Sequence, residues 1–301
     1  MEDKEAKMRI REFVPLSNYT SYGIGGPARY FCQPTNPAEV KTALSFAREK
    51  NIPYYVLGKG TNVLISDAGL AGMVIHLGKD FSRLTIESHR VIAESGLALN
   101  RLIHTLAEQH LGGFEVLAGI PGSIAGAVVM NAGAYRVFIG DYIEAVEVIT
   151  PAGQFKTMAN TQLGFAYRTS IFQTRPFHKY IILRTHLGVL PRNENDIKNA
   201  IGLSLEKRRQ HPQLPSCGST FKNPPGIPAG KLIDEMGLKG IRRGRAQIAP
   251  QHGNFIVNLG GATAQDIYNL IRFVQAEIKE ERGITLQTEV KLWGEFKNPP
   301  A

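Results

Sequence analysis

The segment PSCGSTFKNPP, residues 215–225, gathers groups that can do chemistry in a stretch that is neither a helix nor a central strand, because proline interrupts both. Ser219 in its middle has two interpretations. A serine in such a turn commonly bonds its own backbone. It serves as a proton donor only where its hydroxyl is aimed at a reacting atom and nearby donors stabilise the alkoxide. The segment taken alone favours the turn hydroxyl.

Three glycine-containing loops are the second feature: GIGGPA (23–28), VLGKGTNVLISD (56–67) and AGIPGSIAGAVVMNAGAY (118–135). Glycine lets the backbone approach a ligand closely and present N–H groups to phosphate oxygens, although tight turns alone also explain glycines. None of the loops is a Rossmann fingerprint or a P-loop. The last two are nearly free of charge, and each carries an amide, Asn62 or Asn131. Neutral, glycine-lined walls fit a flavin dinucleotide better than a mononucleotide.

The histidines and cysteines do not indicate a metal site. His211 and His252 have no partner at metal-ligand spacing, and we expect no bound metal. A structural hydrogen bond is the favoured role for His252, with a place near substrate as the alternative. Cys32 and Cys217 are too few for a disulfide framework and are interpreted as free thiols.

Composition limits the class of protein. The chain has 301 residues, 43% of them hydrophobic, and a formal charge of +9. No apolar run approaches the ~18 residues of a spanning helix, and the charged start MEDKEAKMRI has no signal-peptide core, so we expect a soluble, cytoplasmic protein with no membrane partner. Dense basic clusters occur only at 207–210 and 241–245. A phosphorylated small molecule therefore explains the charge better than a nucleic acid does.

The elements that must position these groups follow from periodicity and capping signals. Asn36 and Pro37 begin one helix, Thr263 with Asp266 forms a capping box for another, and Gly283 ends it. Helices are predicted at 37–50, 97–111, 191–210, 229–238 and 263–283. Strands are predicted at 28–34, 54–58, 62–66, 72–77, 82–87, 90–95, 144–150, 154–158, 179–190, 254–259 and 285–294, with a hairpin around Gly153.

The motifs, taken in order, carry a resemblance. GIGGPA, LGKGTNVLISD, LAGIPGSIAGAVVMNAGAY, AYRTSIF, PSCGSTFKNP, AGKLIDEMGLKG and LQTEV, spread over residues 18–294, resemble the UDP-N-acetylenolpyruvoylglucosamine reductase family. The resemblance implies an α+β fold: a two-lobed FAD-binding domain of the p-cresol methylhydroxylase and vanillyl-alcohol oxidase type, then an α+β substrate-binding domain. We place the first lobe at 1–81, the second at 82–191 and the substrate-binding domain at 192–301, with the last strand and tail packing back on the first lobe.

The resemblance also implies a reaction in peptidoglycan precursor synthesis. In this family NADPH reduces FAD, and flavin N5 then passes a hydride to UDP-N-acetylglucosamine enolpyruvate, giving UDP-N-acetylmuramate. Arg168 in AYRTS matches the family's arginine and Glu289 in LQTEV its catalytic glutamate, which together stabilise the enolate, and Ser219 matches the proton donor. Lys222 and Asn223 follow within the same motif as substrate contacts, with Tyr167 beside Arg168.

The same resemblance assigns cofactor contacts to two loops. They are Gly58, Lys59, Gly60, Thr61 and Asn62 in the first, and Ile120, Pro121, Gly122, Ser123, Gly126, Asn131, Ala132 and Gly133 in the second. Arg136 stands where the family often has glycine, and Cys217 where alanine is common. The short interval from Arg168 to Ser219 resembles the shorter, type II subtype of the family. We expect a monomer.

Two other functions remain as alternatives. A flavin oxidase acting on another substrate would be reoxidised rapidly by oxygen and would not need the Ser219 motif. A basic nucleic-acid-binding protein would be colourless and would bind DNA in a salt-dependent way. The absorption spectrum of the purified protein separates this last function from the two flavin enzymes.

Overall fold

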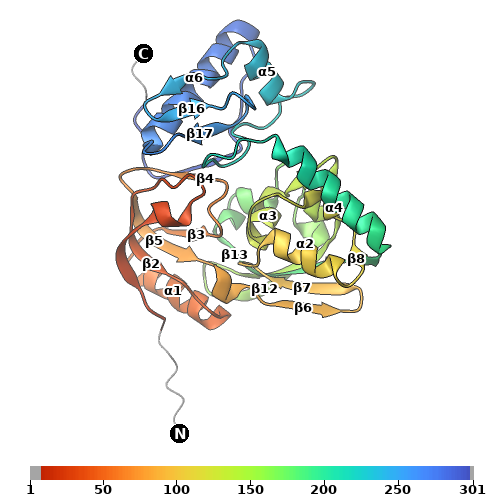
Figure 1. The fold of residues 1–301 in the computed structure, drawn as a ribbon. Coiled ribbons are helices and arrows are strands. Elements are labelled where there is room, and N and C mark those ends of the chain that lie inside the picture. Colours follow the sequence, from red (N-terminus) through yellow and green to blue (C-terminus); the bar gives the residue numbers. More distant parts are fainter. Residues whose placement is uncertain (1–7, 299–301) are drawn as a thin grey trace. The chain divides into compact units, whose positions relative to one another are not determined.

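The computed structural model describes residues 8–298, which divide into two compact units (Figure 1). Unit 1 comprises residues 8–14, 29–59 and 71–205, and unit 2 comprises residues 15–28, 60–70 and 206–298. Each unit is therefore built from segments that are distant in the sequence.

A four-stranded sheet and one helix form the first part of unit 1. The strand order is β1-β2-β5-β3, and β3 runs parallel to β5. The strands are β1 (Arg11–Pro15), β2 (Pro27–Cys32), β3 (Tyr54–Leu57) and β5 (Leu70–His76). Helix α1 (Pro37–Glu49) begins as the sequence predicts, because the Asn36 side chain accepts a hydrogen bond from Glu39 N at 3.0 Å. Its apolar face joins a core built from this sheet and from parts of the next one.

A five-stranded antiparallel sheet forms the second part of unit 1, in the order β12-β11-β13-β7-β6. The predicted hairpin is confirmed, because β11 and β12 pair from Ile149 with Phe155 to Ala145 with Ala159. The strands are β6 (Leu84–Glu87), β7 (Arg90–Glu94), β11 (Ile143–Ile149), β12 (Phe155–Ala159) and β13 (Ile181–Gly188).

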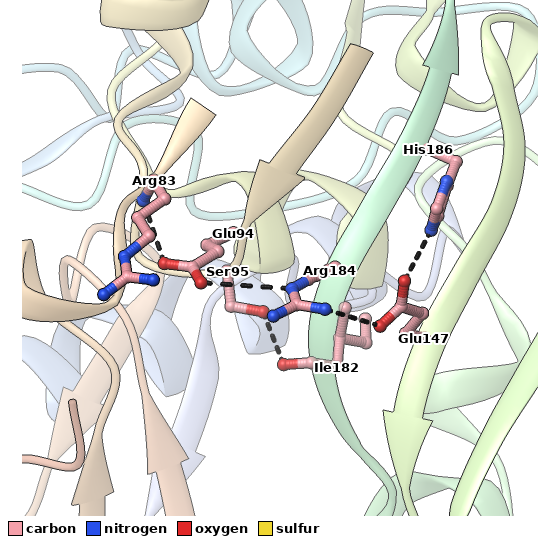
Figure 2. A network of polar contacts seen from close by, with 7 residues as sticks. All are labelled: Arg83, Glu94, Ser95, Glu147, Ile182, Arg184 and His186. Carbon is pink, nitrogen blue, oxygen red and sulfur yellow. Dashed lines mark hydrogen bonds and ion pairs between the residues drawn. The ribbon is translucent and has the colours of Figure 1, made fainter. Parts of the chain in front are cut away.

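A row of polar side chains crosses three strands of this sheet (Figure 2). Arg184 on β13 lies between Glu94 on β7 and Glu147 on β11, at nitrogen–oxygen distances of 3.9 and 3.3 Å. Glu147 also meets His186 Nε2 at 2.7 Å. Glu94 is only 6% exposed, so the guanidinium balances a buried carboxylate.

Three helices cover the core of the larger sheet: α2 (Leu99–Ala107), α3 (Ile124–Met130) and α4 (Glu194–Arg209). From the sequence, residues 118–135 are predicted to form a glycine-containing loop. This prediction is wrong for residues 124–130, which form helix α3. Ser123 accepts a weak hydrogen bond from Gly126 N at 3.4 Å, which caps α3, and Asn131 ends the helix at φ 42°. Buried Ile124 and Val128 hold the helix on the core, so packing decides the conformation of a segment in which Gly126 and the valines oppose the helix preference of the alanines.

Short pairings and 3-10 turns complete unit 1. β8 (Leu111–Gly112) pairs with β14 (Leu190–Pro191), and β9 (Gly133–Ala134) pairs with β10 (Val137–Phe138). The 3-10 turns of unit 1 are Lys79–Phe81, Glu115–Leu117, Ile139–Asp141, Asn160–Gln162, Ile171–Gln173 and Phe177–Lys179.

Unit 2 packs two helices on a three-stranded sheet of order β15-β16-β17 (Figure 1). The elements are the 3-10 turn Leu16–Tyr19, β4 (Val63–Ile65), α5 (Ala229–Glu235), β15 (Arg242–Arg243), β16 (Ala246–Ile248), β17 (Ile256–Asn258), α6 (Ala264–Arg282) and β18 (Lys291–Trp293). The predicted caps of α6 are confirmed: Thr263 and Asp266 exchange hydrogen bonds, and Gly283 ends the helix at φ 67°. The Asp67 carboxylate also accepts hydrogen bonds from the first two N–H groups of α6.

The last predicted strand is shorter than expected. The sequence predicts an alternating strand over 285–294, but only β18 forms, paired in parallel with β4. Residues 285–290 form no regular strand, and Leu292 within β18 is 37% exposed. Glu289 therefore lies in a bend before the strand, where other segments of unit 2 hold its backbone.

Candidate functional site

The loop that carries Ser219 is attached to the segment before β17. Thr220 N donates to Asn254 O at 2.8 Å, and the Asn254 side chain binds both backbone groups of Phe221. An isolated bridge pairs Ser219 with Phe255. Gly218, at φ +69°, supplies the left-handed turn directly before the serine. Ser219 is therefore set on a backbone fixed on both sides rather than in a freely moving turn.

The backbone of Glu289 is joined to the same loop. Glu289 N donates to Thr220 O at 2.8 Å, and Asn62 Nδ2 donates to Glu289 O at 3.2 Å. Lys291 N in turn donates to Asn62 O at 3.0 Å. Two of the predicted catalytic residues, Ser219 and Glu289, thus lie on backbone segments connected through Thr220, within unit 2.

Two lysines, Lys222 and Lys291, lie on the backbone segments next to Glu289. Lys222 N donates to Gln287 O at 2.9 Å, which ties the lysine to the segment before Glu289. Burial lowers the pKa of the Lys291 ammonium, the nearby Lys222 charge lowers it further, and Glu289 opposes the shift. Lys291 is not among the residues predicted from the sequence. Its position two residues after Glu289, at the start of β18, is the one local signal that points to it.

A pocket of about 330 Å³ adjoins Ser219 in unit 2. Asn223, predicted to bind substrate, borders it, and its Oδ1 accepts a hydrogen bond from Ala229 N at 2.9 Å, at the start of α5. Lys231 and Lys239 border it, and so does Asp234, whose carboxylate pairs with Lys239 Nζ at 2.8 Å. The lining residues are Ser219, Asn223, Pro228, Gly230, Lys231, Asp234, Lys239, Gln251, His252, Gly253 and Asn254.

His252 makes a structural hydrogen bond, the role that the sequence favours, and its place near substrate stays a prediction. It borders the pocket beside Ser219, and its Nδ1 accepts a hydrogen bond from Asn254 N at 3.2 Å. Burial lowers the pKa of the His252 imidazole, and the Lys239 charge adds to this, while a hydrogen bond to its own backbone opposes it.

Arg168 lies at the tip of a tight turn in unit 1. Ala166 and Thr169 exchange backbone hydrogen bonds of 3.1 Å, which leaves Tyr167 and Arg168 as the two turn residues. Arg168 has a left-handed backbone, φ 52°, and its guanidinium carbon lies 5.9 Å from the centre of the Tyr167 ring. The Tyr167 side chain is 46% exposed. The turn therefore presents a cation and an aromatic ring together.

Neighbouring side chains fix this turn on the end of α3. Asn131 Nδ2 donates to Ala166 O at 3.0 Å, and Asn131 Oδ1 accepts from Gly140 N at 3.0 Å. Gln173 Nε2 donates to Arg168 O at 3.0 Å. Asn131 was selected as a cofactor contact; its buried side chain here supports the arginine turn.

The two glycine loops approach each other within unit 1. A Cβ placed on Gly58 would lie 2.3 Å from Ser123 Oγ, so a larger residue there would force the Ser123 side chain to move. Lys59 is the one charged side chain among the selected loop residues, and no carboxylate occurs among them. Small, neutral backbone with a single cation fits an anionic dinucleotide such as FAD.

The other selected cofactor residues differ in exposure and location. Gly60, Thr61 and Asn62 belong to unit 2, and a Cβ on Gly60 would lie 2.0 Å from Tyr19 O. In unit 1, Pro121 and Gly126 are exposed, Ile120 and Gly122 half-buried, and Ala132 and Gly133 buried. Their contacts with a cofactor stay predictions.

Comparison with known proteins gives the family. The family model described as UDP-N-acetylenolpyruvoylglucosamine reductase, C-terminal domain, matches residues 210–293, and the FAD binding domain model matches residues 28–159. The chain is 42% identical to the UDP-N-acetylenolpyruvoylglucosamine reductase of Clostridium botulinum (strain 657), over 94% of this chain and 92% of that protein. This chain belongs to the UDP-N-acetylenolpyruvoylglucosamine reductase family.

Two further relatives agree with this membership. The reductase of Caldanaerobacter subterraneus is 38% identical over 97% of this chain and 95% of its own. The crystal structure of the family's enzyme from Thermus caldophilus has a TM-score of 0.83 and 39% identity, over 95% of this chain and all of that one. The predicted FAD-binding domain with a C-terminal domain of this reductase family is confirmed, as is a flavin-dependent oxidoreductase.

Within residues 8–298 no helix is long and apolar enough to cross a membrane. In the same range no three or more His, Cys, Asp or Glu are grouped so as to hold a metal ion.

Proposed function

We propose that this chain reduces UDP-N-acetylglucosamine enolpyruvate to UDP-N-acetylmuramate, a peptidoglycan precursor, with NADPH as the source of electrons. The observation that carries the proposal is the connection of Ser219 and Glu289 through Thr220 beside a lysine-bordered pocket. In this proposal residues 1–191 hold FAD in two lobes that meet near residue 81, and residues 192–301 bind substrate. The cytoplasmic location and monomeric state belong to the same proposal.

The reaction adds a hydride and a proton across the enol ether double bond. FAD held by the glycine loops at 58–62 and 120–133 would, once reduced by NADPH, supply the hydride for the terminal vinyl carbon. Ser219 then gives its hydroxyl proton to the neighbouring carbon, and the serine oxygen is reprotonated from solvent before the next turnover. An ordinary serine is a weak acid, so the proposal assigns stabilisation of the oxygen, as its proton leaves, to Lys222, three residues after Ser219, and to Lys291, whose charge interacts with Lys222 and Glu289.

Arg168 and Glu289 complete the proposed chemistry. A guanidinium binds a carboxylate through two parallel hydrogen bonds and keeps its proton, so Arg168 is assigned to the substrate carboxylate on which enolate charge develops. Glu289 is assigned, together with Arg168, to stabilise the enolate that Ser219 protonates. The nucleotide diphosphate carries negative charge that suits Lys231 and Lys239 in the pocket, with Asn223 as a neutral donor.

The test separates the two half-reactions. Under anaerobic conditions Ser219→Ala should still be bleached by NADPH, whereas the return of flavin absorbance on adding the enol ether should slow by about 10²–10⁴-fold. Ser216→Ala, three residues earlier in the same segment, is the matched control and should keep both rates. If Ser219→Ala reoxidises its flavin with the enol ether at the wild-type rate, Ser219 is not the proton donor. Rapid reoxidation of wild type by oxygen, with no response to the enol ether, would instead favour an oxidase.

A further inference from the structure

Asn254 makes an unusually complete set of hydrogen bonds to the residues that follow Ser219. Its Oδ1 accepts from Phe221 N at 2.9 Å, and its Nδ2 donates to Phe221 O at 2.8 Å. Its own carbonyl accepts from Thr220 N at 2.8 Å. The Asn254 side chain is only 3% exposed, so each of these bonds would be costly to lose.

His252 holds Asn254 in turn. Asn254 N donates to His252 Nδ1 at 3.2 Å, which requires Nδ1 to be an acceptor and the imidazole proton to sit on Nε2. A protonated imidazole carries N–H groups on both nitrogens and cannot accept this bond. The bond therefore exists only in the neutral form of His252.

We propose that His252 and Asn254 are positioning residues for Ser219, and that protonation of His252 releases the loop and slows proton delivery to the substrate. The proposal rests on the proposed donor role of Ser219. It assigns His252 no proton transfer of its own. The chain of contacts runs from the imidazole to Asn254, and from there to Thr220 and Phe221, the two residues directly after the serine.

The surroundings of His252 favour its neutral form near pH 7. Its ring centre lies 5.6 Å from that of His211 and 4.8 Å from that of Phe255, and Gly230 of α5 packs against its Cε1. Burial lowers the pKa of His211 as well, and so do the neighbouring His252 and Arg208. The charged or titratable groups on the elements packed against His252 are His211 and Arg208 on one side, Lys231, Asp234 and Glu235 on α5, and Lys239 after it.

The direction of the pH effect follows from the lowered pKa. His252 stays neutral down to a pH below the ordinary value of 6.5. The hydrogen bond to Asn254 is thus complete at neutral pH and is lost as the pH falls through the folded-state pKa. The second half-reaction should therefore show an acid limb below pH 6.5 that depends on one proton.

The experiment compares two substitutions that differ in one property. Asparagine keeps an acceptor oxygen near the position of Nδ1 but cannot be protonated, whereas leucine keeps bulk and has no acceptor. The measurement is the rate of flavin reoxidation by the enol ether in anaerobic stopped flow, from pH 5 to pH 8. FAD content and thermal melting of each variant check that the protein is folded.

We expect His252→Asn to lose the acid limb and to react about tenfold faster at pH 7.5 than His252→Leu, since a misplacement of about 1 Å costs up to ~10²-fold. His211→Asn should keep the acid limb, which separates the two neighbouring histidines. Asn254→Ala should slow the same step, whereas Asn160→Ala, which loses two side-chain hydrogen bonds to carbonyls in unit 1, should not.

Two results overturn the inference: an unchanged acid limb in His252→Asn, or equal rates for His252→Asn and His252→Leu. If His252→Leu does not fold, the presence or absence of the acid limb in the pH profile of His252→Asn still tests the inference. The proposed function is judged separately by Ser219→Ala. If Ser219→Ala reoxidises its flavin with the enol ether at the wild-type rate, the donor role and the positioning role are both refuted. If Ser219→Ala is slow but His252→Asn keeps the acid limb of the pH profile, only the positioning role is refuted.

Discussion

Substitution of Gly58 by alanine tests the close approach of the two glycine loops in unit 1. The backbone φ of Gly58 lies outside the left-handed region, so alanine brings no conformational strain. Its new methyl group would lie 2.3 Å from Ser123 Oγ and 3.3 Å from Ser123 Cβ. Buried Ser123 can move only by giving up its hydrogen bond to α3, so we expect a loss of about 1–3 kcal/mol in the free energy of unfolding.

A double substitution isolates the cause. Ser123→Ala alone removes a long cap of 3.4 Å and should cost about 0.5–1 kcal/mol. In that background the oxygen is gone, so Gly58→Ala should cost clearly less than in the wild type, with a coupling of about 1–2 kcal/mol. Gly202→Ala in α4 is the matched control, because nothing lies within 4 Å of its Cβ position and alanine favours a helix.

The assay follows release of FAD on heating by flavin fluorescence, together with urea unfolding followed by circular dichroism. Gly58→Ala should release FAD at a temperature several degrees lower, at about 2–4 °C per kcal/mol. Gly202→Ala should be unchanged or slightly more stable. An equal cost of Gly58→Ala with and without Ser123→Ala would refute the steric argument.

Three further predictions concern stability and reactivity. Arg184→Met should lower the free energy of unfolding by about 1–3 kcal/mol in urea at pH 7, because it leaves the buried Glu94 carboxylate without its cation; a loss below ~0.3 kcal/mol would contradict this. Thr263→Ala should cost about 1 kcal/mol through loss of the α6 cap, measured the same way, and Thr263→Ser should restore most of it. Cys32 and Cys217 are buried, and burial raises the pKa of each thiol to about 12, so iodoacetamide at pH 8 should label neither in the native protein and both in urea; rapid native labelling detected by mass spectrometry would disprove the burial.

Prediction succeeded where a structural element is specified by residues close together in the sequence, as helix caps and short turns are. Asn36 caps α1, and the capping box at Thr263 and the glycine at 283 bound α6, since such signals act over a few residues. The hairpin around Gly153 followed from two apolar runs separated by a short turn.

Prediction failed where packing overrides a weak local preference. Residues 124–130 combine two alanines, which favour a helix, with Gly126 and two valines, which disfavour it, so their local preference is weak, and burial of Ile124 and Val128 makes them helical. Residues 285–294 alternate as a strand does, but their partner β4 is only three residues long and pairs with Lys291–Trp293. An alternation of apolar and polar residues indicates that a segment is suited to a strand. The strand forms only where a neighbouring strand supplies the backbone hydrogen bonds.

The sequence by itself determined the family, the FAD-binding character and the selection of Arg168, Ser219 and Glu289. Each of these depends on short motifs and on their order along the chain, and both can be read from the sequence. Tertiary structure alone decided how some of them are held. The bond from Asn62 to Glu289 joins residues 227 positions apart, and that from Asn254 to Phe221 spans 33. No local pattern encodes such pairs, since they exist only once the backbone has brought distant segments within hydrogen-bonding distance.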